Sequence, residues 1–143
     1  MTKYWINTIS KDHVMRGVAG GFTQANHGKP QALKRLQAGD WVVFYSPKTA
    51  YQDGEPLQAF TAIAQVADDE LYRVEMSPSF VPWRRNLKFY KCQEAPIRPI
   101  IEELTFIKDK SRWGYMFRFG LFQIPKADFE LIATALHAKI KVE

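Results

Sequence analysis

Two aromatic residues lie in polar stretches of the sequence, where they could bind a planar ligand. Phe22 lies among hydroxyl and amide side chains in a segment bounded by glycines, and Trp83 immediately precedes Arg84 and Arg85. An aromatic ring in a loop offers a face for base stacking, and amides and hydroxyls can hydrogen-bond the edge of an extruded base. The two segments therefore favour a nucleic-acid ligand. The alternative for each ring is a lid folded back on the core, because most large aromatic side chains of a small domain are buried.

Motifs of enzymatic chemistry are missing from the sequence. The glycine-rich segment 17–21 lacks the spacing of a dinucleotide-binding loop, and Pro30 stands where a phosphate-binding loop carries Ser or Thr. Cys92 is the only cysteine, and the three histidines are widely spaced, so no pair stands at metal-ligand spacing. No serine has the flanking glycines of a nucleophile elbow. We therefore expect no catalytic residue, no metal site and no cofactor.

The composition is typical of one globular domain, and we expect residues 1–143 to form it. Of the 143 residues, 46% are hydrophobic and 24% are charged, which excludes wholesale disorder. The lone Cys92 cannot form an internal disulfide and no apolar signal sequence is visible, so we expect a cytoplasmic protein. No apolar run approaches the roughly 20 residues of a membrane-spanning helix, so no membrane partner is expected.

The net charge of +5 is unevenly distributed along the chain. Residues 11–52 and 76–125 are net positive, whereas residues 53–75 are net negative. The two basic segments would form one surface for a polyanion only if the fold brings them together. Charge alone favours the simpler interpretation, a solvated surface that keeps the protein soluble.

Short strands separated by Gly and Pro residues must position the candidate side chains. Apolar and aromatic patterning predicts strands over residues 4–10, 41–46, 59–67, 72–76, 87–90 and 113–120. Helical patterning predicts helices over residues 11–18 and 30–36, one turn over 100–104, and an amphipathic helix from Pro125 onward. We predict a polar loop over residues 20–28. This order of elements is typical of a small twisted β-barrel with flanking helices.

Six segments together give the chain a family resemblance: YWINTISKDHV (4–14), GFTQANHG (21–28), FYSPK (44–48), LQAFTAI (57–63), PWRR (82–85) and FRFGLF (117–122). In their order and spacing they resemble the EVE domain, a PUA-like domain related to the YTH domain. The resemblance implies an α+β fold, a pseudo-β-barrel of about five or six strands with flanking helices. It also implies a pocket between the first strand, the loop after it and the Trp-bearing loop.

The resemblance and the polar side chains near the implied pocket give a set of candidate site residues. We expect the pocket for a base to contain Asn7, Thr8, Ser10, Phe22, Thr23, Gln24, Asn26, Tyr45, Ser46 and Trp83. Around its mouth, we expect phosphate contacts from Lys11, Arg16, Lys48, Arg84 and Arg85. Trp83 would take the place of the cage Trp of YTH domains, whereas Phe22 stands where those domains carry Trp, which implies a smaller or shallower cage.

The function implied is a non-enzymatic module that reads a modified or flipped base, with modified cytosine as one ligand, in DNA or RNA. YTH domains read N6-methyladenine in RNA, and EVE domains are thought to read modified bases. We expect the protein to be a monomer. One alternative is an amidohydrolase acting on modified nucleosides, like the related ASCH domains, with His13, His27, Lys11 or Lys48 transferring protons. Another is a protein-interaction module with an exposed aromatic patch.

Overall fold

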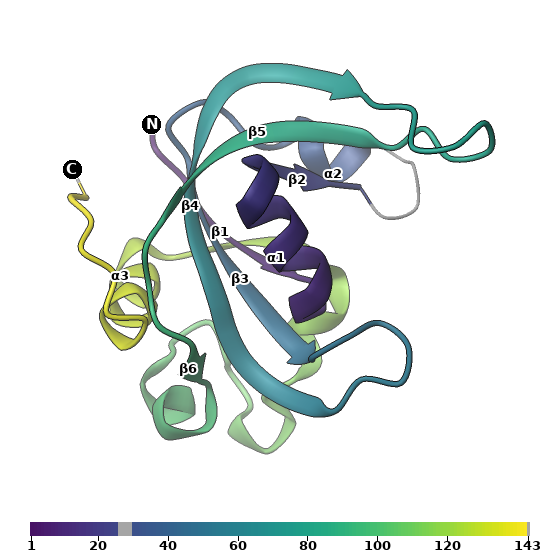
Figure 1. Cartoon of the computed structure of the whole chain (residues 1–143). Coiled ribbons are helices and arrows are strands. Elements are labelled where there is room, and N and C mark those ends of the chain that lie inside the picture. Colours follow the sequence, from purple (N-terminus) through teal and green to yellow (C-terminus); the bar gives the residue numbers. More distant parts are fainter. Residues whose placement is uncertain (26–29, 143) are drawn as a thin grey trace.

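Seven strands form one mixed sheet in the computed structural model, which describes residues 1–25 and 30–142 (Figure 1). In chain order the strands are β1 (Tyr4–Thr8), β2 (Phe22–Gln24), β3 (Trp41–Lys48), β4 (Pro56–Arg73), β5 (Trp83–Tyr90), β6 (Ala95–Pro96) and β7 (Leu121–Ile124). The helices are α1 (Lys11–Gly20), α2 (Gln31–Lys34) and α3 (Lys126–Ala135), with 3₁₀-helices η1 (Arg98–Glu103), η2 (Lys110–Arg112) and η3 (Tyr115–Phe119). None of the helices within the described residues is long and apolar enough to cross a bilayer.

The sheet has the strand order β2-β5-β4-β3-β1-β7, and β6 pairs with β4. β1 and β3 run parallel, whereas the other neighbours are antiparallel. The order ends at β2 and β7, so the sheet of the described residues is not closed. The expected α+β fold with flanking helices is confirmed, and its strands number seven rather than the predicted five or six.

β4 is the longest strand and connects the two halves of the sheet. It pairs with β3 and β6 along its first half and with β5 further along. Register shifts interrupt the pairing with β3 after Phe44, and the pairing with β5 between Val66 and Leu71. Such irregularities bend a strand. The small buried side chains of Ala62 and Ala64 leave room for close packing on the bent strand.

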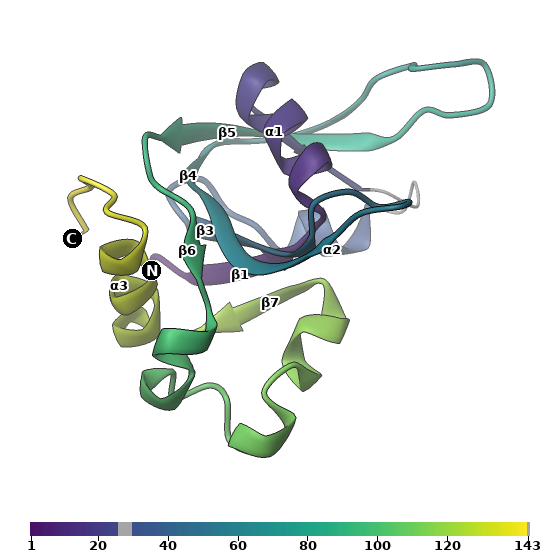
Figure 2. The same cartoon turned by 60° about the horizontal axis from the view of Figure 1, so that its bottom comes forward.

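An apolar cluster lies on each face of the sheet, because successive side chains of a strand point to opposite sides. On β1, Ile6 belongs to the cluster that α3 and the 3₁₀-helices cover, and Trp5 to the cluster under α1 and α2. On β3, Val43 and Val42 divide in the same way. Figure 2 shows α1 on one side of the sheet and the segment from β6 to η3 on the other. The side chains of one strand therefore pack alternately into two separate apolar clusters.

Most predicted elements are confirmed with shifted ends. The strands predicted over residues 4–10, 41–46, 59–67 and 87–90 correspond to β1, β3, β4 and β5, and the helices predicted at 11–18 and from Pro125 onward correspond to α1 and α3. The strand predicted over 72–76 is the end of β4, which stops at Arg73. The predicted loop over 20–28 contains β2, because three of its residues pair with β5.

The prediction of a strand over residues 113–120 is wrong. The 3₁₀-helix η3 occupies Tyr115–Phe119, and β7 begins only at Leu121. The aromatic composition of this segment is typical of strands, but in a strand residues 115, 117 and 119 would share one face, and here they do not. Phe117 is buried, whereas both Tyr115 and Phe119 are exposed. Gly120 follows with a φ of 71°, a conformation that glycine adopts readily, and leads the chain into β7.

The phenol of Tyr45 makes the stability of this fold dependent on pH. Tyr45 is buried on the α3 side of β3 and stacks on Phe117 with 4.1 Å between ring centroids. Burial raises the pKa of Tyr45 from 10.0 to about 12, although the charge of Arg98 lowers it. The folded state therefore holds this proton more tightly than the unfolded state. Its contribution to stability is complete below pH 10 and is lost as the pH rises towards 12.

We expect Tyr45→Phe to flatten the alkaline loss of stability. Between about pH 9 and pH 11 the variant should lose about 1 kcal/mol less free energy of unfolding than the unsubstituted protein. Urea unfolding at each pH measures this difference. Tyr51→Phe is the matched control, because Tyr51 is 69% exposed. Identical pH profiles for Tyr45→Phe and the unsubstituted protein would contradict the prediction.

Candidate functional site

A pocket of about 360 Å³ opens on the α1 side of the sheet. It lies between α1, β2, the β3–β4 loop and the β4–β5 hairpin. Five aromatic side chains contribute to its described lining: Phe22, Phe44, Tyr51, Phe80 and Phe89. The other described lining residues are Ile9, His13, Val14, Arg16, Gly17, Thr23, Gln24, Met76 and Arg84. The described lining thus combines aromatic rings and positive charge without a carboxylate, and its volume is near the lower end of the range for ligand pockets, about 300–1,000 Å³.

Two glycines of α1 bring the helix against β2. A Cβ atom on Gly17 would collide with the carbonyl oxygen of Phe22, and a Cβ atom on Gly20 would collide with the Phe22 ring. The next residue, Gly21, ends the helix in a left-handed conformation with a φ of 75°, as is common at helix ends. The glycine-rich segment that lacks phosphate-loop spacing therefore has a structural role. Its glycines let α1 pack directly against Phe22.

The guanidinium of Arg84 lies over the Phe22 ring, with its Cζ atom 3.8 Å from the ring centroid. A cation at this distance from an aromatic face is attracted to the ring. The pairing of β2 with β5 places Gln24 opposite Arg84. Nε of Arg84 donates a 2.8 Å hydrogen bond to Oε1 of Gln24. The ring and the amide together orient Arg84 in the pocket wall.

The deepest described part of the pocket is aromatic. Phe44 and Phe89 stack with 5.7 Å between centroids and 29° between ring planes, and Phe44 is almost fully buried. Thr23 also lines the pocket and is only 4% exposed. Asn7 lies behind it, and Nδ2 of Asn7 donates a long hydrogen bond of 3.4 Å to Oγ1 of Thr23. Asn7 therefore positions a lining residue instead of lining the pocket itself.

His13 and Tyr51 form another part of the wall, with their rings stacked 6.3 Å apart. Oδ2 of Asp12 lies 3.9 Å from Nε2 of His13. Burial acts to raise the pKa of Asp12, but hydrogen bonds from the Ser10 hydroxyl and the His13 amide, with the charges of His13 and Arg16, outweigh it and lower that pKa. Asp12 is therefore ionised at neutral pH and compensates part of the positive charge beside the pocket.

The structure brings several predicted site residues together in the lining: Arg16, Phe22, Thr23, Gln24 and Arg84. They come from α1, β2 and β5. The neighbouring strands β2 and β5 supply four of the five, so the pairing of these two strands builds the predicted part of the site.

Other predicted pocket residues lie outside the described lining. Tyr45 belongs to the cluster on the α3 side, and the alternation of β1 places Thr8 on that side with Ile6. Ser46 is fully buried, and its hydroxyl shares a 2.8 Å hydrogen bond with Thr61. Ser10 stands just before α1, where its hydroxyl donates to Asp12.

Trp83 also lies outside the described lining. It is partly buried against the cluster under α1 and α2, and the Arg73 guanidinium lies 5.3 Å from its ring centroid. The expectation that Phe22 and Trp83 flank one pocket is therefore corrected, because the group facing the Phe22 ring is Arg84. Asn26, another predicted pocket residue, lies outside the described residues.

Arg85 cannot make the predicted phosphate contact, because its side chain is buried. It is 2% exposed, and its Nη1 donates to the carbonyl oxygens of Leu33 and Leu36 at 2.8 and 2.6 Å. Its Nη2 donates to the carbonyl oxygen of Asp68 at 2.8 Å. A charged group remains buried only when such partners replace water. Arg85 therefore holds the end of α2 and the turn at Asp68 against β5.

The two predicted lysine contacts stand outside the described lining as well. The ammonium of Lys11 forms a 2.9 Å ion pair with Glu94. Lys48 is exposed at the end of β3.

Most of the apolar lining is not predicted by the sequence. Strand patterning around Phe44 and Phe89 indicates no role in a pocket, because nothing in the sequence distinguishes a pocket floor from a core. Tyr51 and Phe80, like Phe22, are aromatic residues in polar loops, and this signal is enough to locate them. Met76 gives no comparable signal.

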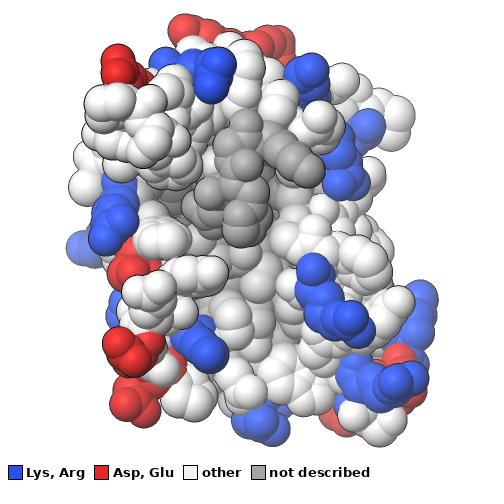
Figure 3. All heavy atoms as spheres, turned by 90° about the vertical axis from the view of Figure 1, so that its right-hand side faces the viewer, with Lys and Arg blue, Asp and Glu red and all other residues white. Residues whose placement is uncertain are grey.

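Figure 3 views the molecule from the side on which α1, the β3–β4 loop and the β4–β5 hairpin project. Lys and Arg side chains lie along both margins of this face, and acidic side chains gather at its upper edge and lower left. The two basic segments of the sequence thus contribute to one face, in part through Arg16 and Arg84 in the pocket itself.

Comparison with known proteins identifies the family. Residues 3–135 match the sequence model of the EVE domain. The chain belongs to the EVE domain family. Its relatives include a UPF0310 protein of Mycolicibacterium vanbaalenii, 66% identical over 132 residues that cover 92% of this chain and 91% of the relative. The UPF0310 protein YdcG of Bacillus subtilis is 41% identical over 139 residues, which cover 97% and 95% of the two chains. The PUA-like fold expected from the resemblance is the fold of this family.

Two solved structures share the fold of this chain. The NMR structure of Rpa0253 from Rhodopseudomonas palustris superposes with a TM-score of 0.56 at 17% identity, covering 95% of this chain and 94% of that one. A hypothetical protein from Leishmania major gives a TM-score of 0.53 at 10% identity, covering 96% of both chains. At these identities the likeness concerns the fold alone.

We expect Gly17→Ala to disturb the EVE pocket through the contact between α1 and β2. The added methyl group collides with the Phe22 carbonyl, so the helix must shift, and the free energy of unfolding should fall by about 1–3 kcal/mol. Gly114→Ala is the matched control, because a Cβ atom there meets no atom within 4 Å. Urea unfolding of both variants measures the difference, and equal stabilities would show that this contact does not constrain the helix.

Proposed function

We propose that this EVE domain binds a base extruded from a nucleic-acid strand and leaves it chemically unchanged. The observation that carries the proposal is the lining of the pocket, which joins aromatic rings to Arg16 and Arg84 and has no carboxylate among its described residues. Aromatic faces stack on bases, and guanidinium groups pair with phosphate. A nucleotide supplies both of these groups in one ligand.

Stacking would supply most of the affinity. A base on an aromatic side chain contributes about 1–3 kcal/mol. In the free protein the Phe22 ring is covered by Arg84, so an entering base must displace the guanidinium or stack on it. Guanidinium planes also stack on bases, so Arg84 can keep an attractive contact in the complex while its charge meets the phosphate.

Preference for a modified base would depend on shape and on polar contacts more than on stacking. One added methyl group contributes about 0.8 kcal/mol on burial, a factor of about four. A polar group left unpaired by the wrong base costs about 1–3 kcal/mol. Among the described lining residues Gln24 has an amide, and Thr23 and Tyr51 have hydroxyl groups. We assign the base edge to Gln24 and Thr23, which are neighbours on β2. The resemblance to readers of modified bases makes a modified cytosine the first ligand to test.

The alternatives have less support from the described lining. His13 lines the pocket, but no Ser, Cys, Lys, Asp or Glu joins it among the described lining residues. An amidohydrolase reaction would have to use the hydroxyl of Thr23, which accepts a hydrogen bond from Asn7, or the phenol of Tyr51. A concave pocket of about 360 Å³ also suits a small planar group better than a protein surface, which buries about 800 Å² per partner.

We expect Phe22→Ala to weaken binding of a single-stranded DNA with one central 5-methylcytosine at least tenfold, through the loss of one stacking face. Fluorescence anisotropy with a labelled ten-nucleotide probe measures the Kd. Met15→Ala is the control, because Met15 is an exposed residue of α1 outside the described lining. Mass spectrometry of the recovered probe should find it intact, and release of a product would favour the enzyme. Unchanged affinity in Phe22→Ala would refute the assignment of the base to this pocket.

We expect the affinity to fall linearly with salt on logarithmic axes. Each phosphate engaged contributes a slope of about −0.7 for a single strand and about −0.9 for a duplex. Arg84→Gln and Arg16→Gln should each reduce the slope by about one such increment, whereas Lys139→Gln, in the chain after α3, should leave it unchanged. A salt-independent Kd would remove nucleic acid as the ligand.

A further inference from the structure

Two aromatic side chains on η3 are exposed without being part of the described pocket lining. Tyr115 is 52% exposed and Phe119 is 57% exposed, and their rings meet edge to face with 5.6 Å between centroids. Large aromatic side chains of a small domain are usually buried. Here they form one small surface together with the exposed Arg118, whose Cζ atom lies 5.6 Å from the Tyr115 ring centroid. We call Tyr115, Arg118 and Phe119 the η3 surface.

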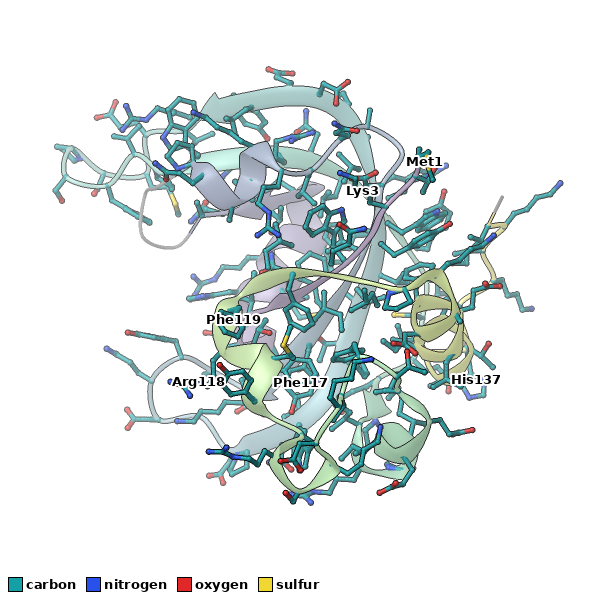
Figure 4. The ribbon with its side chains drawn as sticks, turned by 180° about the vertical axis from the view of Figure 1, so that it is seen from behind. Met1, Lys3, Phe117, Arg118, Phe119 and His137 are labelled. Carbon is teal, nitrogen blue, oxygen red and sulfur yellow. The ribbon has the colours of Figure 1, made fainter. Side chains whose placement is uncertain are left out.

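Contacts of Phe117 and Gly120 fix the position of η3. Phe117, between the exposed rings in sequence, is buried and stacks on Tyr45. The carbonyl oxygen of Gly120 accepts a 2.9 Å hydrogen bond from the backbone amide of Thr8, which ties the end of η3 to the end of β1. Figure 4 shows Phe119 and Arg118 on the outer side of η3 and Phe117 on its inner side. The backbone of η3 is therefore held in place beneath the exposed rings.

The electrostatic surroundings of the η3 surface favour an anion. Residues 110–127 contain no Asp or Glu, but include two arginines and two lysines. Arg112, three residues before Tyr115, is exposed. Arg35 of the neighbouring segment donates from its Nη1 to the carbonyl oxygen of Leu121 at 3.2 Å, so a further exposed guanidinium lies at the end of η3. Aromatic rings among arginines are typical of proteins that bind single-stranded nucleic acid.

The η3 surface and the pocket lie on opposite faces of the sheet but at the same end of β1. The Thr8 amide that holds Gly120 immediately precedes Ile9, which lines the pocket. In Figures 1 and 2, η3 lies on the side from which the β3–β4 loop and the β4–β5 hairpin project, and both of these segments also line the pocket. A nucleic-acid strand with one base in the pocket would therefore pass close to the η3 surface.

We propose that the η3 surface binds nucleotides that flank the base held in the pocket, by stacking on Tyr115 and Phe119 and by pairing of phosphate with Arg118. The inference rests on the proposed function and makes the ligand a single-stranded segment longer than one nucleotide. A protein partner could also use exposed aromatic rings, but the run of residues without a carboxylate favours the polyanion.

The test compares a long probe with a short one. The long probe is the labelled ten-nucleotide single-stranded DNA with a central 5-methylcytosine, and the short probe is 5-methyl-2′-deoxycytidine 5′-monophosphate. The double variant Tyr115→Ala/Phe119→Ala should raise the Kd for the long probe at least fivefold and leave the Kd for the short probe within twofold. Arg118→Gln should reduce the salt slope for the long probe by about 0.7. Lys139→Gln, which removes an exposed cation in the chain after α3, is its matched control.

The outcomes separate the two proposals. If Phe22→Ala weakens both probes and the η3 double variant weakens only the long probe, both proposals are supported. If the double variant binds the long probe as well as the unsubstituted protein does, the η3 inference is overturned while the pocket keeps its ligand. If the unsubstituted protein binds neither probe, the proposed function fails. Loss of self-association by the double variant with DNA binding retained would assign the η3 surface to a protein contact and overturn the inference.

Discussion

The pairing of β1 with β3 is the constraint on which the rest of the structure depends. Both strands lie inside the sheet and run parallel, so their side chains alternate between the two faces in register. Asn7 and Phe44 are partners in this register and lie on the α1 side, whereas Thr8 and Tyr45, the next pair, lie on the α3 side. One step along β3 therefore separates the pocket residue Phe44 from the core residue Tyr45, and one step along β1 separates Asn7, which bonds to the lining residue Thr23, from Thr8.

The two adjacent arginines of β5 also have their side chains on opposite sides of the strand. In the sequence Arg84 and Arg85 look like one basic patch, but neighbours on a strand point to opposite sides. Arg84 faces Phe22 and Gln24, where water and a ligand can reach it. Arg85 is buried and bonded to backbone carbonyl groups, so its charge stabilises the fold and is not available to a ligand. Desolvating a guanidinium is expensive, and the three carbonyl partners offset that cost.

The sequence was sufficient for most of the elements and for most of the polar lining residues, but not for the apolar ones. Local patterning located β1, β3 and α3, and an aromatic residue in a polar segment located Phe22. The strand prediction at 113–120 was wrong because aromatic composition suits both a strand and a 3₁₀-helix, and only the tertiary packing of Phe117 decides between them. Phe44 could not be recognised as a lining residue for a related reason. Whether a buried ring meets another side chain or an open cavity depends on residues far away in sequence.

The short strand β2 carries the residues that would provide both affinity and selectivity for a base. It contributes Phe22 for stacking, Thr23 as a hydroxyl and Gln24 as an amide, and each has a partner outside the strand. The glycines of α1 seat Phe22, a side chain of β1 bonds to Thr23, and a side chain of β5 bonds to Gln24. Three residues alone could not hold these groups in fixed directions, because a strand of that length has little stability of its own. Selectivity among bases would therefore depend as much on these three supporting contacts as on the residues that touch the ligand.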